Sequence, residues 1–242
     1  MRRRDFLALA SLGPLFEWIP FFRPQHISLA GARFRIRYNG RSNRRYLLIH
    51  GDEATARQAI ERDIETHEGI AYIVEGRTRN VRIDSGEVDP NRIFSHAGAE
   101  ANLKKLNPQW NAEQVQAALA TLDRGREKLV RAFFPPRGGL LVALHNNTVG
   151  YSVFDEEPIS NAASIREPNR PHAFFLATDP ADYKVLTGSP YNVVLQNHVS
   201  TDDGPLSRLA AERHVRYVNL EAGLGHLARQ QEMLAWLEWY LP

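Results

Sequence analysis

Two histidines follow stretches typical of buried strands, and a carboxylate lies close to one of them. His50 comes directly after the apolar run Tyr46–Ile49, and Glu53 follows three residues later. His145 comes directly after a second apolar run, Leu140–Leu144. Two imidazoles and a carboxylate are a common donor set of catalytic zinc sites, in which a fourth position stays open for water. We interpret these three side chains as a candidate metal site; His50 and Glu53 by themselves also fit the capped start of a helix.

The candidate ligands can meet only if both strands belong to one sheet. The chain alternates apolar runs with helical patterns, the longest of which ends before Pro135 and Pro136 because proline cannot continue a helix. Further strands are expected at residues 32–38, 70–74, 173–177, 191–195 and 215–220, and helices at residues 54–66, 111–134 and 227–240. This alternation predicts one α/β domain over residues 26–242, with a mixed, mostly parallel central sheet flanked by helices. Open sheets of this kind bind ligands at the carboxyl ends of their strands, where both histidines would lie.

The composition excludes several classes of protein. The chain has 242 residues, a formal net charge of +2 and no cysteine, so it has no disulfide, thiol nucleophile or cysteine-based zinc site. Arg2, Arg3 and Arg4 supply three of the positive charges, which leaves the rest of the chain close to neutral. No basic stripe is interleaved with aromatic residues. We therefore expect no nucleic-acid partner.

The first 25 residues differ in character from the rest of the chain. Arg3 and Arg4 precede the apolar stretch Phe6–Phe22, which is the order of a twin-arginine export signal. Pro14 and Pro20 interrupt this stretch and make it a poor membrane-spanning helix. We expect an export signal or N-terminal anchor here, a periplasmic protein, and no stable membrane span in the mature chain. If this segment is not a signal, the protein would be cytoplasmic.

Four short motifs occur along the chain in a fixed order. They are His50-Gly51-Asp52-Glu53, Asp89-Pro90-Asn91-Arg92-Ile93-Phe94, Leu144-His145-Asn146-Asn147-Thr148 and a late glutamate, Glu221. In this order they resemble the zinc carboxypeptidase superfamily, and within it the succinylglutamate desuccinylase and aspartoacylase branch most of all. The match spans most of the chain, from Tyr46 to the region of Gly225. The resemblance implies the zinc carboxypeptidase-like fold for the α/β domain.

The resemblance also implies a role for each matching residue. His50, Glu53 and His145 would hold one Zn²⁺ per chain, and a zinc ion activates water for hydrolysis. Asn91 and Arg92 would bind the free carboxylate of the substrate, because a guanidinium fork fits a carboxylate bidentately.

Three further roles are implied outside these ligands. Glu221 would be the general base that takes the proton of the attacking water. Arg82 would polarise the scissile carbonyl, with Arg77 and Arg79 as alternatives. A tyrosine would line the site, and the sequence leaves open whether it is Tyr151, Tyr183 or Tyr191.

These roles together predict zinc-dependent hydrolysis of an amide or peptide bond next to a free carboxylate. The export signal alone favours a carboxypeptidase or murein-peptide amidase, whereas the closest motif match suits an N-acyl amino acid deacylase. The partner would be a small peptide or an N-acyl amino acid. A hypothesis from another class is a non-catalytic descendant that binds peptides or carboxylates. Loss of a ligand or of the base would indicate that descendant, but all four residues are present.

Overall fold

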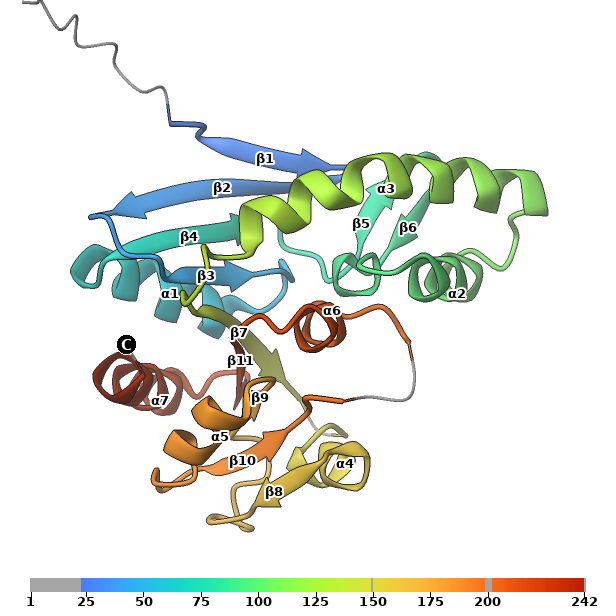
Figure 1. Ribbon diagram of the computed structural model, residues 1–242. Helices are drawn as coiled ribbons and strands as arrows, with labels where there is room; N and C mark the ends of the chain where they lie inside the picture. The colour runs from blue at the N-terminus through green and yellow to red at the C-terminus, as the bar shows by residue number, and fades with distance from the viewer. Residues whose placement is uncertain (1–22, 149, 199–201, 242) are drawn as a thin grey trace, which may run out of the picture.

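The part of the chain that the computed structural model describes, residues 23–148, 150–198 and 202–241, alternates strands and helices (Figure 1). Its strands are β1 (His26–Leu29), β2 (Ala32–Asn39), β3 (Arg45–Leu48), β4 (Gly69–Val74), β5 (Val81–Ile83), β6 (Gly86–Val88), β7 (Leu141–Asn147), β8 (Ala162–Ser164), β9 (Phe174–Ala177), β10 (Asn192–Leu195) and β11 (Tyr217–Gly223). Nine of them form one sheet in the order β1-β2-β4-β3-β7-β11-β9-β10-β8, and β5 pairs with β6 in a separate hairpin.

The centre of the large sheet is parallel. Parallel pairings join β4 to β3, β3 to β7 and β7 to β11, and a further one joins β9 to β10. Antiparallel pairings lie at β1–β2, β2–β4, β11–β9 and β10–β8. Because β3, β7 and β11 are parallel neighbours, their carboxyl ends lie at one edge of the sheet, where the candidate site is built.

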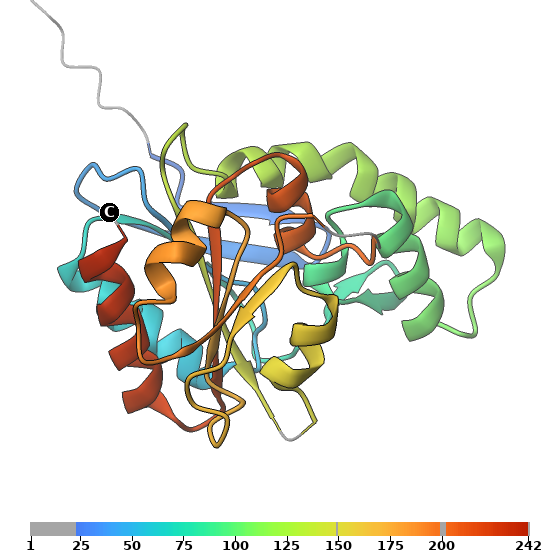
Figure 2. The ribbon, with the colours of Figure 1, turned by 60° about the horizontal axis from the view of Figure 1, so that its bottom comes forward.

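Helices flank the sheet on both faces (Figures 1 and 2). They are α1 (Ala54–Thr66), α2 (His96–Leu106), α3 (Ala112–Phe133), α4 (Val153–Glu156), α5 (Pro180–Leu186), α6 (Leu206–Glu212) and α7 (Leu227–Tyr240), with single 3₁₀ turns η1 (Pro90–Arg92) and η2 (Glu157–Ile159). Consecutive residues of β2 show the two faces. Phe34 packs edge-on against Phe133 of α3, whereas Arg35 forms an ion pair with Glu61 of α1. Since successive strand residues point to opposite faces, α3 and α1 cover opposite sides of the sheet.

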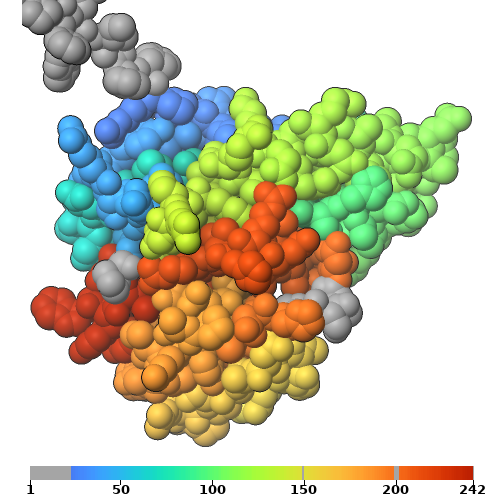
Figure 3. All heavy atoms as spheres, viewed as in Figure 1, coloured from blue at the N-terminus to red at the C-terminus, as the bar shows by residue number. Residues whose placement is uncertain are grey.

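Two parts of the molecule meet at the candidate site. In Figure 3 the residues of β1 to α3, coloured blue to green, form the upper part, and α4 to β10, coloured yellow to orange, form the lower part. β7 and β11 run between them (Figure 1). Groups from both parts can therefore face a ligand held at the ends of these strands.

The predicted α/β domain, a mixed sheet flanked by helices, is confirmed, and α1 and α7 begin and end at the predicted residues. The strands at the site are longer than predicted. β7 continues through His145 to Asn147, and β11 continues through Glu221 to Gly223. The reason is the parallel β7–β11 pairing, which extends past the apolar runs into the polar residues of the site.

The export signal expected in residues 1–25 lies outside the described residues except for its last three. Within the residues that are described, we find no helix with the length and apolar character needed to cross a membrane.

Candidate metal centre

His50 and Glu53 lie on a tight connection between β3 and α1. β3 ends at Leu48, and the chain turns through Gly51 before α1 begins after Glu53. The Gly51 N–H donates to the carbonyl oxygen of Thr78 at 3.0 Å, and a Cβ at this position would lie only 2.7 Å from that oxygen. Glycine is therefore required for the close approach of the two backbones.

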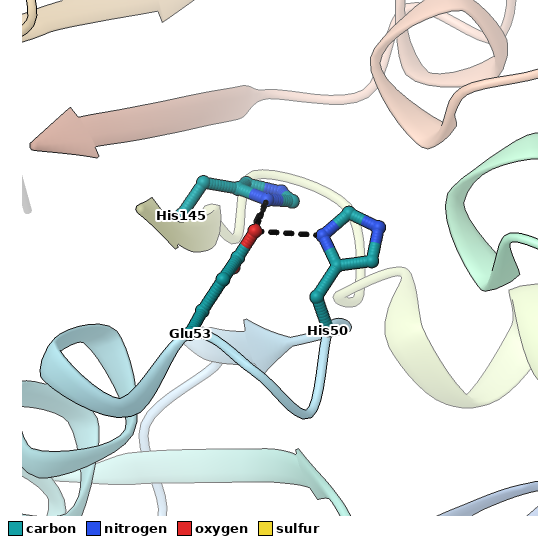
Figure 4. Close-up of side chains that lie close together, drawn as sticks. All are labelled: His50, Glu53 and His145. Atoms are coloured by element: carbon teal, nitrogen blue, oxygen red, sulfur yellow. Dashed lines mark hydrogen bonds and ion pairs between the residues drawn. The ribbon is translucent and has the colours of Figure 1, made fainter. Parts of the chain in front are cut away.

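The two histidines converge on Glu53 (Figure 4). Nδ1 of His50 lies 2.8 Å from Oε1 of Glu53, and Nδ1 of His145 lies 3.3 Å from the same oxygen. All three side chains are buried. Glu53 occupies the N-cap position of α1, but its carboxylate forms no capping hydrogen bond. The side chain is thus turned toward the imidazoles and does not serve as the cap of the helix.

These three residues fit a zinc ion. One donor atom from each lies within 4.8 Å of the others. Oε2 of Glu53 is buried and accepts no hydrogen bond from the residues that the structure describes, although Nδ1 of His145 lies 3.3 Å away. A buried carboxylate oxygen that lacks a donor is costly unless a cation is bound to it. Nitrogen and carboxylate donors in a set of three are also the ligands that catalytic zinc uses.

Asp89 orients His50 from the side opposite Glu53. Its Oδ1 lies 2.9 Å from Nε2 of His50 and also accepts the backbone N–H of Asn91 at 2.8 Å. Such a carboxylate fixes the imidazole orientation and leaves the other ring nitrogen for the metal. The sequence motif contains Asp89, but the sequence by itself does not indicate this role.

The charges in this cluster support one another. Burial alone would lower the pKa of His50, but hydrogen bonds and charge interactions with Asp89 and Glu53 raise this pKa to about 9. Burial alone would raise the pKa of Glu53, but the two histidines lower this pKa to about 2. The carboxylates therefore stabilise positive charge between them, and a bound metal would displace the proton.

Glu221 lies next to this cluster on β11. Its two carboxylate oxygens accept hydrogen bonds from Nδ2 of Asn219 at 3.1 Å and from Nδ2 of Asn147 at 3.2 Å. Burial raises the pKa of Glu221, while the charge of His145 and the two carboxamides act in the opposite direction. A buried carboxylate with a raised pKa, held in place by two donors, is suited to accept a proton.

A cavity of about 540 Å³ joins these groups. It is lined by most of the residues that were predicted for the site, namely His50, Glu53, Asn91, Arg92, His145, Tyr151 and Glu221. Of the three candidate tyrosines, Tyr151 lines the cavity, whereas Tyr183 and Tyr191 do not.

The structure does not bring Arg82 to this cavity. Arg82 lies on β5 with an exposed side chain, and its backbone packs against Gly31. Arg79 lines the cavity instead, with its guanidinium nitrogens 3.6 Å from Oε1 of Glu53 and 3.4 Å from Oδ2 of Asp89. The geometry favours the alternative Arg79, because the loop before β5 passes the metal ligands and β5 itself leads away.

Arg92 shares a carboxylate with a second arginine that the sequence did not indicate. Nη1 of Arg92 lies 2.6 Å from Oδ2 of Asp203, and Nε of Arg208 lies 3.4 Å from Oδ1. Gly204, with a φ of +86°, lets this loop touch the backbone of Arg92, where a Cβ would lie 2.4 Å from the carbonyl oxygen. All three charged residues line the cavity.

Asn91 has a structural contact as well. Its Oδ1 accepts the backbone N–H of Leu206 at 3.2 Å, at the start of α6. Asn91 and Arg92 both line the cavity, and the Nδ2 group of Asn91 can donate two hydrogen bonds.

The chain matches no family model and no curated protein. Among solved structures, it is similar to the apo form of the ectoine utilization protein EutE (DoeB) from Ruegeria pomeroyi, with 16% identity, a TM-score of 0.45, and coverage of 85% of this chain and 59% of that chain. The product-bound form of the same protein has 16% identity and a TM-score of 0.44, with coverage of 86% of this chain and 60% of that chain. The succinylglutamate desuccinylase from Chromobacterium violaceum has 18% identity and a TM-score of 0.46, with coverage of 86% of this chain and 66% of that chain. The chain therefore spans less than two thirds of the length of these proteins.

Proposed function

We propose that this protein is a zinc-dependent hydrolase that cleaves an amide or peptide bond next to a free carboxylate. The proposal rests on one observation above all: His50, Glu53 and His145 converge beside the buried Glu221, in a cavity that also contains Arg92. Zinc bound by the three ligands would activate a water molecule and attract the carbonyl oxygen.

Glu221 acts as the general base and then as the general acid in this mechanism. It accepts the proton of the attacking water and then delivers it to the leaving nitrogen. Hydrogen bonds from Asn219 and Asn147 hold both carboxylate oxygens in position, and burial keeps the pKa raised, so that the acid form can return the proton.

The arginines bind the substrate. Arg79 stabilises the negative charge that develops on the carbonyl oxygen. Its guanidinium already lies beside the metal ligand Glu53, so it does not have to be reoriented during the reaction. Arg92 and Asn91 bind the free carboxylate of the substrate, with Arg208 as a further cation on the same side of the cavity. A deacylase and a peptidase would both use this arrangement.

Two substrate classes follow from the proposal. A short peptide suits the expected export of the protein, and an N-acyl amino acid suits the resemblance of the four motifs to the succinylglutamate desuccinylase and aspartoacylase branch. A panel of both kinds, with products identified by mass spectrometry, distinguishes them. Cleavage of acyl amino acids alone would rule out the peptidase assignment.

The metal is tested first. We expect the purified, unchelated protein to contain about one zinc per chain by elemental analysis, and the double variant His50→Ala/His145→Ala to contain none. A protein that binds no zinc after zinc is added back, or a zinc-loaded protein that cleaves no member of the panel, would contradict the proposed hydrolase and favour a non-catalytic binding protein.

A further inference from the structure

Most charged side chains of the cavity are paired with one another. Arg79 interacts with the carboxylates of Glu53 and Asp89. Arg92 and Arg208 both interact with the one carboxylate of Asp203, which leaves one of these two positive charges for a ligand. That surplus suits the free carboxylate of the substrate.

Glu156 supplies a negative charge that is not balanced by a positive one. It lies at the end of α4 and lines the same cavity. Its Oε1 accepts the hydroxyl of Tyr151 at 2.7 Å, and its Oε2 accepts the carboxamide N–H of Gln196. Both donors are neutral, and among the residues that the structure describes Glu156 forms no ion pair. Its negative charge therefore remains for a ligand.

Arg208 contacts Gln196 and forms no ion pair with Glu156. Oε1 of Gln196 faces Nη1 of Arg208 at 3.4 Å, while Nε2 of the same carboxamide binds Glu156. Gln196 thus separates a cationic part of the cavity from an anionic part. Both parts are held by hydrogen bonds before any ligand arrives, which reduces the ordering that binding requires.

The lining of the cavity is partly apolar. Leu176 and the exposed Ile159 line it together with Tyr151 and Glu156, and Ile159 lies in the 3₁₀ turn that follows Glu156. An apolar wall with a fixed carboxylate suits an aliphatic chain that ends in a cation, because the methylene groups leave water while the charge gains a partner. The same cavity contains Arg92 for a carboxylate.

We propose that Glu156 binds the cationic end of the substrate side chain, so that the substrate class is an amide with a free carboxylate and a lysine-like basic side chain. This inference rests on the proposed function for the carboxylate and the scissile bond, and it adds the residue that determines specificity. Opposite charges on the two parts of the cavity orient such a ligand and disfavour an acidic side chain at Glu156.

The test compares L-lysine with L-norleucine, two product-like ligands that share the carboxylate and the aliphatic stem and differ in the terminal ammonium. Calorimetric titration of the zinc-loaded full chain is expected to give about tenfold tighter binding of lysine. Glu156→Gln should bring the two ligands to similar affinity, and Glu156→Asp should restore part of the preference. Glu157→Gln removes an exposed charge next in the chain and should leave the preference unchanged.

Equal affinity of the parent for both ligands, or no binding of either, would overturn the inference. So would a preference that persists in Glu156→Gln, or a loss of both ligands alike, since the latter is the result of a purely structural role. Hydrolysis of the matched N-acetyl derivatives is measured separately. Lysine preference without any hydrolysis would contradict only the proposed function, whereas hydrolysis without lysine preference would contradict only this inference.

Discussion

Glu221 lies directly beside His145, because the two residues are register partners in the parallel pairing of β11 with β7. Register partners in a parallel pair project to the same face of the sheet. The predicted base and a predicted metal ligand therefore come together through backbone pairing. They lie at the same edge of the sheet as His50, which follows the end of the neighbouring strand β3.

Glu221→Gln should retain zinc and lose turnover. Glutamine keeps the shape and one acceptor oxygen of the side chain but cannot take a proton, so kcat is expected to fall by about 10²–10⁴-fold. Zinc content and kcat measured on the same preparation check this. Turnover at the parent's rate would show that Glu221 is not the base.

Asp89→Asn should weaken metal binding without removing a ligand. Asp89 holds Nε2 of His50, and loss of such an orienting carboxylate typically costs roughly 10- to 100-fold in metal affinity. Competition with a chelator of known affinity measures the change. Asp84→Asn, at an exposed position in the turn between β5 and β6, is the control and should bind zinc as the parent does.

Arg79 and Arg82 should differ sharply in their effect on catalysis. Arg79→Ala removes a cation beside the metal ligands and is expected to lower kcat/KM by about 10²–10³-fold. Arg82→Ala removes an exposed cation outside the cavity and should retain the parent's kcat/KM. The reverse order of effects would restore Arg82, the assignment that the family resemblance implied.

Asp63 should make stability depend on pH. Burial, followed by the charge of Glu238, raises the pKa of this α1 residue to about 6, although His67 pairs with Oδ1 at 2.9 Å and acts in the opposite direction. The folded pKa lies above the unfolded value near 3.9, so the contribution of Asp63 to stability is fully present below pH 4 and is lost as the pH rises through about 6.

Asp63→Asn removes this titration. The stability of the variant relative to the parent should therefore increase between pH 4 and pH 7, by on the order of 2 kcal/mol. Urea unfolding of both proteins at the two pH values measures it. Glu65→Gln, an exposed change on the same helix, should show no such increase, and a constant difference for Asp63→Asn would mean that its pKa is unshifted.

Export is testable independently of activity. We propose that residues 1–25 direct the chain to the periplasm, and a reporter fused to them should be found there. Changing Arg3 and Arg4 to lysine should keep the reporter in the cytoplasm, because the twin-arginine signal is read by a receptor and is not a matter of charge alone. Arg23→Lys is the control. Periplasmic reporter in the double variant would argue against this signal.

Much of the site could be predicted from the chain because its parts are local. His50 and His145 each follow an apolar run that forms a central strand, and Glu53 is close enough to His50 to share one turn. Such short-range patterns can be recognised in the sequence because the spacing of apolar residues along the chain indicates which segments form buried strands and helices. The α/β alternation, and with it the mixed sheet, could be predicted for the same reason.

The choice between Arg79 and Arg82 could not be predicted in this way. The two residues are three positions apart, and the loop before β5 passes the metal ligands through tertiary contacts such as the packing of Gly51 against Thr78. The carboxylate shared by Arg92 and Arg208 likewise depends on Gly204 touching the backbone of Arg92.

The sequence by itself thus determined which chemical groups are present and which strand ends carry them. The tertiary structure alone decided which charges meet at the cavity, and that Glu156 has two neutral donors and no ion pair within the part of the chain that the structure describes. The physical reason is that strand and helix patterns follow from neighbours along the chain, whereas charge pairing depends on distances between segments that meet only when the sheet is assembled.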